Sequence, residues 1–246
     1  LMAIAMVALV VSDASFRVYF VNLKSIPYQV TKFKDLLWIS LPIGLQMVLE
    51  SGAFGIAAIM VGWLGAGEIA AHQIALNMAA VTYMAATGIA ASATVRVGNE
   101  LGKKNYPQLL KAGYSAMVLV LIYMSTTASL FVMLRFYLPT LYIEEMAVIK
   151  MASSLLLIAA FFQLSDGIQV VGFGSLRGMG DVVIPSLAVF VAYYIIGLPF
   201  GYWLTFYMKV GIEGVWYGLC TGLFFVSVFL FWRFRRKALA LIVKNS

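Results

Sequence analysis

Long apolar runs separated by short polar segments dominate the chain. Six of the runs hold about 20 residues or more, which is the length that an α-helix needs to cross a hydrocarbon core about 30 Å thick. A strand of a membrane β-barrel needs only about ten residues and alternates polar with apolar positions, and the runs lack this alternation. The pattern therefore predicts six membrane-spanning helices, at 36–64, 69–95, 109–138, 146–174, 182–208 and 212–232.

The remaining segments complete an all-α integral membrane architecture. Residues 1–12 are apolar but short for a span, and we expect them to form the end of a preceding transmembrane helix. Residues 13–35 form a polar connector, 36–232 a six-helix lobe, and 233–246 a basic tail. The chain is thus expected to be a fragment of a longer protein.

Composition supports a membrane location and excludes several other classes. Hydrophobic residues make up 63% of the chain and charged residues 11%, against about 25% charged residues in soluble domains. The mean hydropathy is +0.97. The net charge of +7 does not indicate a nucleic-acid partner, because the basic residues stand at the ends of the apolar runs. Cys220 is the single cysteine, so this chain offers no internal disulfide and no cysteine-based metal site.

The distribution of lysine and arginine predicts the orientation. Of the 17 basic residues, 14 fall in connections on one side of the predicted spans and three on the other. Short loops rich in lysine and arginine stay in the cytoplasm. We therefore expect the 13–35 connector and the C-terminus to be cytoplasmic.

Two G-x-x-x-G motifs occur in the last two predicted spans, at 197–201 and 218–222. Small residues at this spacing let two helices approach closely in a membrane. We expect them to serve packing within the bundle rather than a dimer interface. Pro199 lies within the first motif and favours a kink in its helix.

Two of the ten acidic residues lie deep inside predicted spans. Glu50 is near the middle of 36–64 and is the only charged residue there, while Asp166 lies within 146–174. An ionised aspartate at the centre of a membrane helix costs about 2.5–3.5 kcal/mol on insertion scales. A bound proton, a bound cation or a water-filled cavity removes this cost. The alternative is a protonated carboxyl group that hydrogen-bonds to a neighbouring helix.

Polar side chains accompany both acids at helical spacing. Residues three or four positions apart share a helix face, so we expect inward-facing polar stripes. Carboxylate, amide and phenol oxygens suit a hard cation, and the coupling ion expected here is Na⁺ or H⁺. Hydrogen bonding between helices is an equally good explanation for the amides. The stripes contain Gln46 and Glu50; Gln73 and Asn77; and Gln163, Asp166 and Gln169.

Aromatic residues also flank the acidic positions. Phe54, Tyr83 and Phe162 all lie within a turn or so of a polar stripe. Aromatic faces attract organic cations, which makes Phe54 and Phe162 candidate cavity residues together with Gln46, Asn77, Gln163 and Gln169. Ordinary packing is the simpler explanation for any one of these aromatic side chains.

Four segments give the chain a resemblance to a known family. They read ISLPIGLQMVLESGAF, WLGAGEIAAHQIALN, ASATVRVGNELGKKNYP and GFGSLRGMGDVVIPS. Their order resembles the MATE (multidrug and toxic compound extrusion) transporters, and most of all the bacterial NorM-type branch. The resemblance extends over about 12–236 and implies the second lobe of a twelve-helix transporter whose first lobe is missing from this sequence.

The resemblance implies a function and a set of site residues. Such proteins export organic cations in exchange for Na⁺ or H⁺ by alternating access. Glu50 and Asp166 match the acids of the family's coupling-cation site, so both are candidate Na⁺ ligands, and Tyr83 matches a tyrosine found in some members. Phe162 stands where some members carry a tyrosine, which removes one oxygen ligand. His72 matches the family's A-H-Q segment, and we expect it to pack or to cap its helix.

Two other functions remain open from the sequence. One is a flippase for lipid-linked oligosaccharides from the same superfamily, whose cavities are strongly basic. The other is an intramembrane aspartyl protease, since paired carboxylates perform general acid–base chemistry. The leading expectation is a monomeric antiporter rather than an enzyme. Its expected partners are the lipid bilayer, its own first lobe and cationic drug-like substrates. We expect no cofactor, and the sequence has no ATP-binding motif.

Overall fold

The computed structural model describes residues 8, 12 and 30–245. It separates two compact units, Leu1–Trp38 and Ile39–Ser246. Of the first unit, little more than the opening turns of one helix is described. Most of the expected helix end at 1–12 and most of the 13–35 connector lie outside the described residues. All that follows concerns the second unit.

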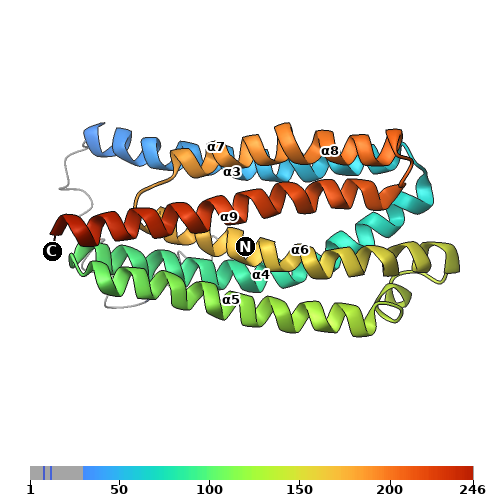
Figure 1. Ribbon diagram of the computed structural model, residues 1–246, viewed down its shortest axis with the longest axis horizontal. Coiled ribbons are helices and arrows are strands. Elements are labelled where there is room, and N and C mark those ends of the chain that lie inside the picture. Colours follow the sequence, from blue (N-terminus) through green and yellow to red (C-terminus); the bar gives the residue numbers. More distant parts are fainter. Residues whose placement is uncertain (1–7, 9–11, 13–29, 246) are drawn as a thin grey trace. The chain divides into compact units, whose positions relative to one another are not determined.

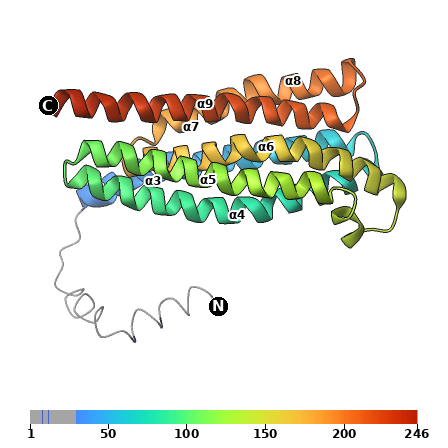
Figure 2. The ribbon, with the colours of Figure 1, turned by 60° about the horizontal axis from the view of Figure 1, so that its bottom comes forward.

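Six stretches of the described chain are long and apolar enough to cross a membrane, which confirms the predicted all-α membrane fold. Figures 1 and 2 show their ribbons running alongside one another. Five of the stretches are α3 (Val30–Gly62), α4 (Ala66–Gly102), α5 (Tyr106–Leu134), α6 (Met146–Gly178) and α9 (Ile212–Asn245). The fifth in chain order, Val183–Tyr207, is built from four shorter helical segments. A short 3₁₀ helix, η2 (Leu138–Leu141), lies between α5 and α6.

Helix α6 extends four residues beyond the predicted end at Gly174, and a glycine turn sets its true end. Gly180 adopts the left-handed conformation, with φ of 69°. Its amide donates to the carbonyl of Arg177 at 2.9 Å, and the amide of Asp181 donates to the carbonyl of Leu176 at 2.9 Å. This pair of bonds satisfies the last carbonyls of a helix. As a result Arg177 is the penultimate residue of a helix and not part of a loop.

The fifth span widens twice along its length. It begins as α7 (Val183–Phe190), widens into the π-helical segment η3 (Val191–Gly197), returns to α8 (Leu198–Tyr202) and widens again in η4 (Trp203–Tyr207). Pro199 has no amide hydrogen to donate to the preceding turn, and η3 lies directly before α8, which contains it. Wide turns of this kind re-aim side chains within an otherwise regular helix.

Helix α6 is the centre of the bundle, because it packs against α4, α5 and α9. The two G-x-x-x-G motifs pack against each other, as the sequence predicts for a bundle interior. The backbone of Gly218 in α9 faces Gly197 of η3 and Gly201 of α8 so closely that a Cβ atom at Gly218 would lie 2.5 Å from atoms of both. The fifth span and α9 therefore touch backbone to backbone.

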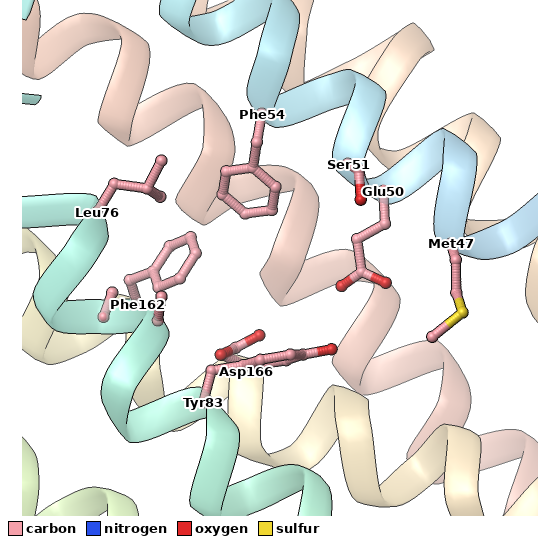
Figure 3. Close-up of a pocket in the computed structure, with 10 residues that line it drawn as sticks. Met47, Glu50, Ser51, Phe54, Leu76, Tyr83, Phe162 and Asp166 are labelled. Atoms are coloured by element: carbon pink, nitrogen blue, oxygen red, sulfur yellow. The ribbon is translucent and has the colours of Figure 1, made fainter. Parts of the chain in front are cut away.

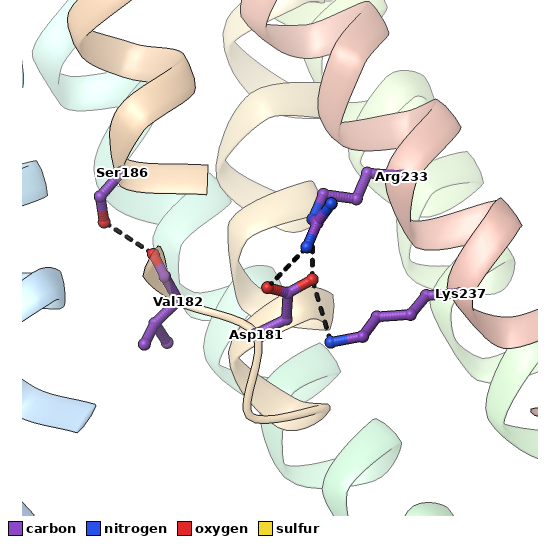
Figure 4. A network of polar contacts seen from close by, with 5 residues as sticks. All are labelled: Asp181, Val182, Ser186, Arg233 and Lys237. Atoms are coloured by element: carbon purple, nitrogen blue, oxygen red, sulfur yellow. Dashed lines mark hydrogen bonds and ion pairs between the residues drawn. The ribbon is translucent and has the colours of Figure 1, made fainter. Parts of the chain in front are cut away.

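An ion cluster joins the turn after α6 to α9 (Figure 4). Arg233 donates two hydrogen bonds to the carboxylate of Asp181, at 2.8 and 3.1 Å. Lys237, one turn further along α9, lies 3.1 Å from the same carboxylate. The basic segment that follows Trp232 is thus helical through Asn245, and its first turns hold the α6–α7 connection in place.

Candidate functional site

A cavity of about 300 Å³ opens between α3, α4 and α6. Figure 3 shows the carboxylate of Glu50, from α3, pointing into this space, with Tyr83 of α4 and Asp166 of α6 on the other side. Both charged residues in the lining are acidic, and most of the remaining lining is apolar. The full set is Met47, Glu50, Ser51, Phe54, Leu76, Ala79, Ala80, Tyr83, Phe162 and Asp166.

Glu50 accepts a hydrogen bond from an amide whose orientation is fixed by a further residue. The side-chain nitrogen of Gln169 donates to Glu50 Oε1 at 2.7 Å. The hydroxyl of Tyr193, on η3, donates to the oxygen of the same Gln169 amide at 3.3 Å. Because the tyrosine occupies the amide oxygen, the amide nitrogen faces the carboxylate. A carboxylate that receives such a bond is stabilised in its charged form.

Asp166 has a different environment from Glu50. Its side chain is buried, with 6% of its surface exposed, and among the described residues it has no side-chain hydrogen bond. Its carboxylate lines the same cavity as that of Glu50. Two carboxylates that share a cavity of low dielectric each raise the cost of charging the other. A small cation placed between them relieves both penalties at once.

The apolar wall of the cavity is largely aromatic. The rings of Phe54 and Phe162 meet edge to face, with centroids 6.0 Å apart. Phe54 also contacts Tyr193 at 6.1 Å, and Phe162 contacts Trp216 of α9 at 5.9 Å. An aromatic wall beside two carboxylates provides both kinds of surface that attract an organic cation.

The structure brings together most, but not all, of the residues that the sequence nominates. Glu50, Phe54, Tyr83, Phe162 and Asp166 line one cavity. The other four candidates, Gln46, Asn77, Gln163 and Gln169, do not line the cavity. Gln46 and Gln169 are buried next to Glu50.

Two nominated amides point elsewhere. Gln163 faces α5, where its oxygen accepts a hydrogen bond from Thr127 at 2.9 Å. Asn77 is exposed on the surface of this lobe. Gln163 and Asp166 are only three residues apart on α6, but α6 is buried on nearly all sides, so its polar residues face different neighbours. The expected common stripe of Gln163, Asp166 and Gln169 is therefore divided between two environments.

His72 lies in the core and not at the cavity. It is fully buried, and its Nδ1 accepts a hydrogen bond from the indole nitrogen of Trp216 at 3.1 Å. The two rings also meet edge to face, with centroids 5.7 Å apart. The histidine thus joins α4 to α9, as expected of a packing residue.

Sequence reasoning missed Arg177 and Tyr193. No basic residue was expected near either acid, yet the guanidinium Nη2 of Arg177 donates to Gln46 Oε1 at 3.1 Å. The signal was present in the segment LRGMGD, because a glycine is typical of the position just past a helix end, and Gly180 in that position places Arg177 on the helix. Tyr193 carried no such signal, since its direction depends on the π-helical winding of η3.

The fold and the cavity together define a helical membrane protein with two acidic side chains in one cavity. Comparison with known proteins makes this assignment specific. The MatE family profile matches residues 42–203, and the chain belongs to this family.

Relatives and solved structures agree. A probable multidrug resistance protein NorM of Burkholderia pseudomallei is 36% identical over an alignment of 249 positions, which covers 99% of this chain and 53% of that protein. The multidrug resistance protein NorM of Burkholderia vietnamiensis is 38% identical over 213 residues, or 85% of this chain and 46% of the relative. The chain thus spans about half the length of these relatives.

The same proportion holds for the solved structures. A crystal structure of MATE in the straight conformation superposes with a TM-score of 0.82 at 19% identity, covering 91% of this chain and 50% of that one. The eukaryotic MATE transporter AtDTX14 gives a TM-score of 0.77 at 23% identity, covering 87% and 49%. At these identities the likeness establishes the fold.

Proposed function

We propose that this chain is the C-terminal lobe of an antiporter that exports organic cations in exchange for Na⁺ or H⁺. The observation that carries the proposal is the placement of Glu50 and Asp166 in one cavity with an aromatic wall. The names of the relatives, multidrug resistance proteins, support the same activity for the whole protein. The first lobe supplies the opposite wall of the transport pathway.

The exchange rests on competition for the same negative charge. A coupling ion at Glu50 and Asp166 neutralises the pair. The affinity of the cavity for a cationic drug is then low. When the ion leaves, the carboxylates and the aromatic rings together favour the drug. A conformational change is driven only by guests that bind its two forms with different affinity, and alternate neutralisation of this pair provides that difference. Access alternates between the two sides of the membrane as the lobes move.

The charge of the cavity favours this activity over the flippase. The pyrophosphate of a lipid-linked oligosaccharide needs basic side chains, and the charged residues of the described lining are both acidic. The proposed setting is the bacterial inner membrane with the C-terminus in the cytoplasm, which the excess of lysine and arginine on that side supports.

The test uses the full-length protein in proteoliposomes loaded with ethidium. Efflux is driven either by a Na⁺ gradient at fixed pH or by a pH gradient without Na⁺. We expect Glu50→Gln and Asp166→Asn each to reduce ion-driven efflux by about tenfold or more, within the range of measured coupling energies. Glu145→Gln, which removes an exposed carboxylate at the start of α6, is the matched control and should transport normally. Full ion-driven efflux by both site variants contradicts the proposal.

A further inference from the structure

A cation with incomplete hydrogen bonding lies just outside the cavity. Nη2 of Arg177 donates to Gln46 at 3.1 Å, while its Nε is buried and has no hydrogen-bond partner. Among the described residues no carboxylate lies within ion-pair distance of the guanidinium. A partly buried charge without a counter-ion is costly. Arg177 therefore destabilises the bundle unless its charge is stabilised in another state of the site.

The arginine is aimed at the acidic end of the cavity wall. It follows Asp166 by eleven residues, and at about 100° per residue this returns to nearly the same face of α6. Gln46 lies one turn before Glu50 on α3. The guanidinium binds Gln46, and Glu50, one turn further along α3, lines the cavity.

Gln46 separates the two opposite charges. Its oxygen accepts from Arg177, and Glu50 lies one turn further along the same face of α3. The amide that binds the guanidinium therefore stands beside the carboxylate. In this arrangement Glu50 faces the cavity and can bind a cation there. The guanidinium of Arg177 lies on the other side of Gln46.

We propose that Arg177 is a tethered cation that competes with cations in the cavity for the negative charge of Glu50. This inference rests on the proposed function and deepens it by naming a residue that sets affinity. With a cation bound at Glu50, the positive charge of Arg177 repels that cation and so promotes its release. With the cavity vacated, Arg177 offsets the charge of Glu50 and lowers the cost of the guest-free state. The residue acts through Glu50 and does not touch the guest.

The test measures binding of ethidium, by its fluorescence, to the purified full-length transporter at fixed pH without Na⁺. Removing a nearby positive charge strengthens cation binding, and for charges several ångströms apart near a protein surface we expect Arg177→Gln to tighten ethidium binding by about tenfold. Arg177→Met is a second neutral variant with the same expectation. Arg177→Lys keeps the charge and should remain within about twofold of wild type. Arg235→Gln neutralises an exposed arginine on α9 and is the matched control, with no change expected.

A variant of opposite sign separates this role from a structural one. Gln46→Leu removes the spacer, so that Arg177 pairs with Glu50 directly, and ethidium should bind several-fold more weakly. Damage to the fold weakens binding in every variant and cannot produce the tighter binding expected of Arg177→Gln. Unchanged or weaker binding by both neutral variants at position 177 overturns the inference.

The same assay distinguishes this failure from failure of the proposed function. If Glu50→Gln weakens ethidium binding while the neutral Arg177 variants leave it unchanged, the inference alone is wrong. If Glu50→Gln and Asp166→Asn both bind ethidium as wild type does, or wild type does not bind it, the cavity is not the cation site, and the proposed function and the inference fall together.

Discussion

The contact between the two glycine motifs makes a quantitative prediction about stability. A Cβ atom at Gly218 would lie 2.5 Å from the carbonyl oxygen of Gly197 and 2.5 Å from the Cα atom of Gly201, whereas ordinary contacts fall at 3.4–4 Å. All the obstructing atoms belong to backbone, so no side chain can rotate away. For Gly218→Ala the fifth span and α9 must separate by about 1 Å, and overpacking of this kind costs about 1–3 kcal/mol.

The measurement is thermal unfolding of the full-length protein in detergent, followed by intrinsic fluorescence. A loss of about 2 kcal/mol lowers the midpoint by about 2 °C in a protein of roughly 450 residues, about twice the length of this chain. The control is Gly88→Ala, because a Cβ atom at Gly88 meets nothing within 4 Å and alanine is the better helix former by about 0.5–1 kcal/mol. If Gly218→Ala unfolds at or above the midpoint of wild type, the close helix contact described here is wrong.

Two further predictions concern buried polar pairs. Burial favours the neutral form of Asp181, but the bonds from Arg233 and Lys237 outweigh it and hold the pKa of this carboxyl group below its ordinary 3.8. The charged carboxylate therefore makes its full contribution to stability above the ordinary pKa, and this contribution is lost as the pH falls through the lowered pKa. Asp181→Asn should cost about 1–3 kcal/mol at neutral pH. In unfolding scans across the acid range, the stability of this variant should depend less on pH than that of wild type. His72→Leu leaves the indole N–H of Trp216 buried without its acceptor and should cost about 1–3 kcal/mol. Most of that loss should return in the double variant that also carries Trp216→Phe, and an unrecovered double variant contradicts the pairing.

The sequence predicts the bundle well because hydrophobic length is a strong signal. Each predicted span coincides with a helical stretch, and the ends differ by at most four residues in α5 and α6. Helix α4 runs seven residues beyond its predicted end, to Gly102, and α9 runs thirteen residues beyond its own, to Asn245. The two deep acids were also recognisable, because a carboxylate stands out in an apolar run. That Glu50 and Asp166 come to share one cavity follows from the resemblance and is now seen in the structure.

The neighbours of the other site residues depend on details that hydrophobic periodicity does not encode. The direction of Gln163 is set by Thr127 on another helix, which spacing along α6 cannot reveal. The place of Arg177 depended on where a helix stops, and a glycine turn decides that four residues beyond the last strongly apolar stretch. The aim of Tyr193 depends on a π-helical turn. In each case the residue type was informative, but its neighbour was determined by tertiary packing.

The length of α9 exceeds the thickness of the hydrocarbon layer of a membrane. Its 34 residues extend about 51 Å at 1.5 Å per residue, while the hydrocarbon layer is about 30 Å thick. Roughly two-fifths of the rod must therefore project into headgroups or water. Trp232, an exposed ring of the type that favours the boundary, is followed at once by Arg233, which binds Asp181. The turn after α6 is thereby tied to the part of α9 that we expect to leave the hydrocarbon.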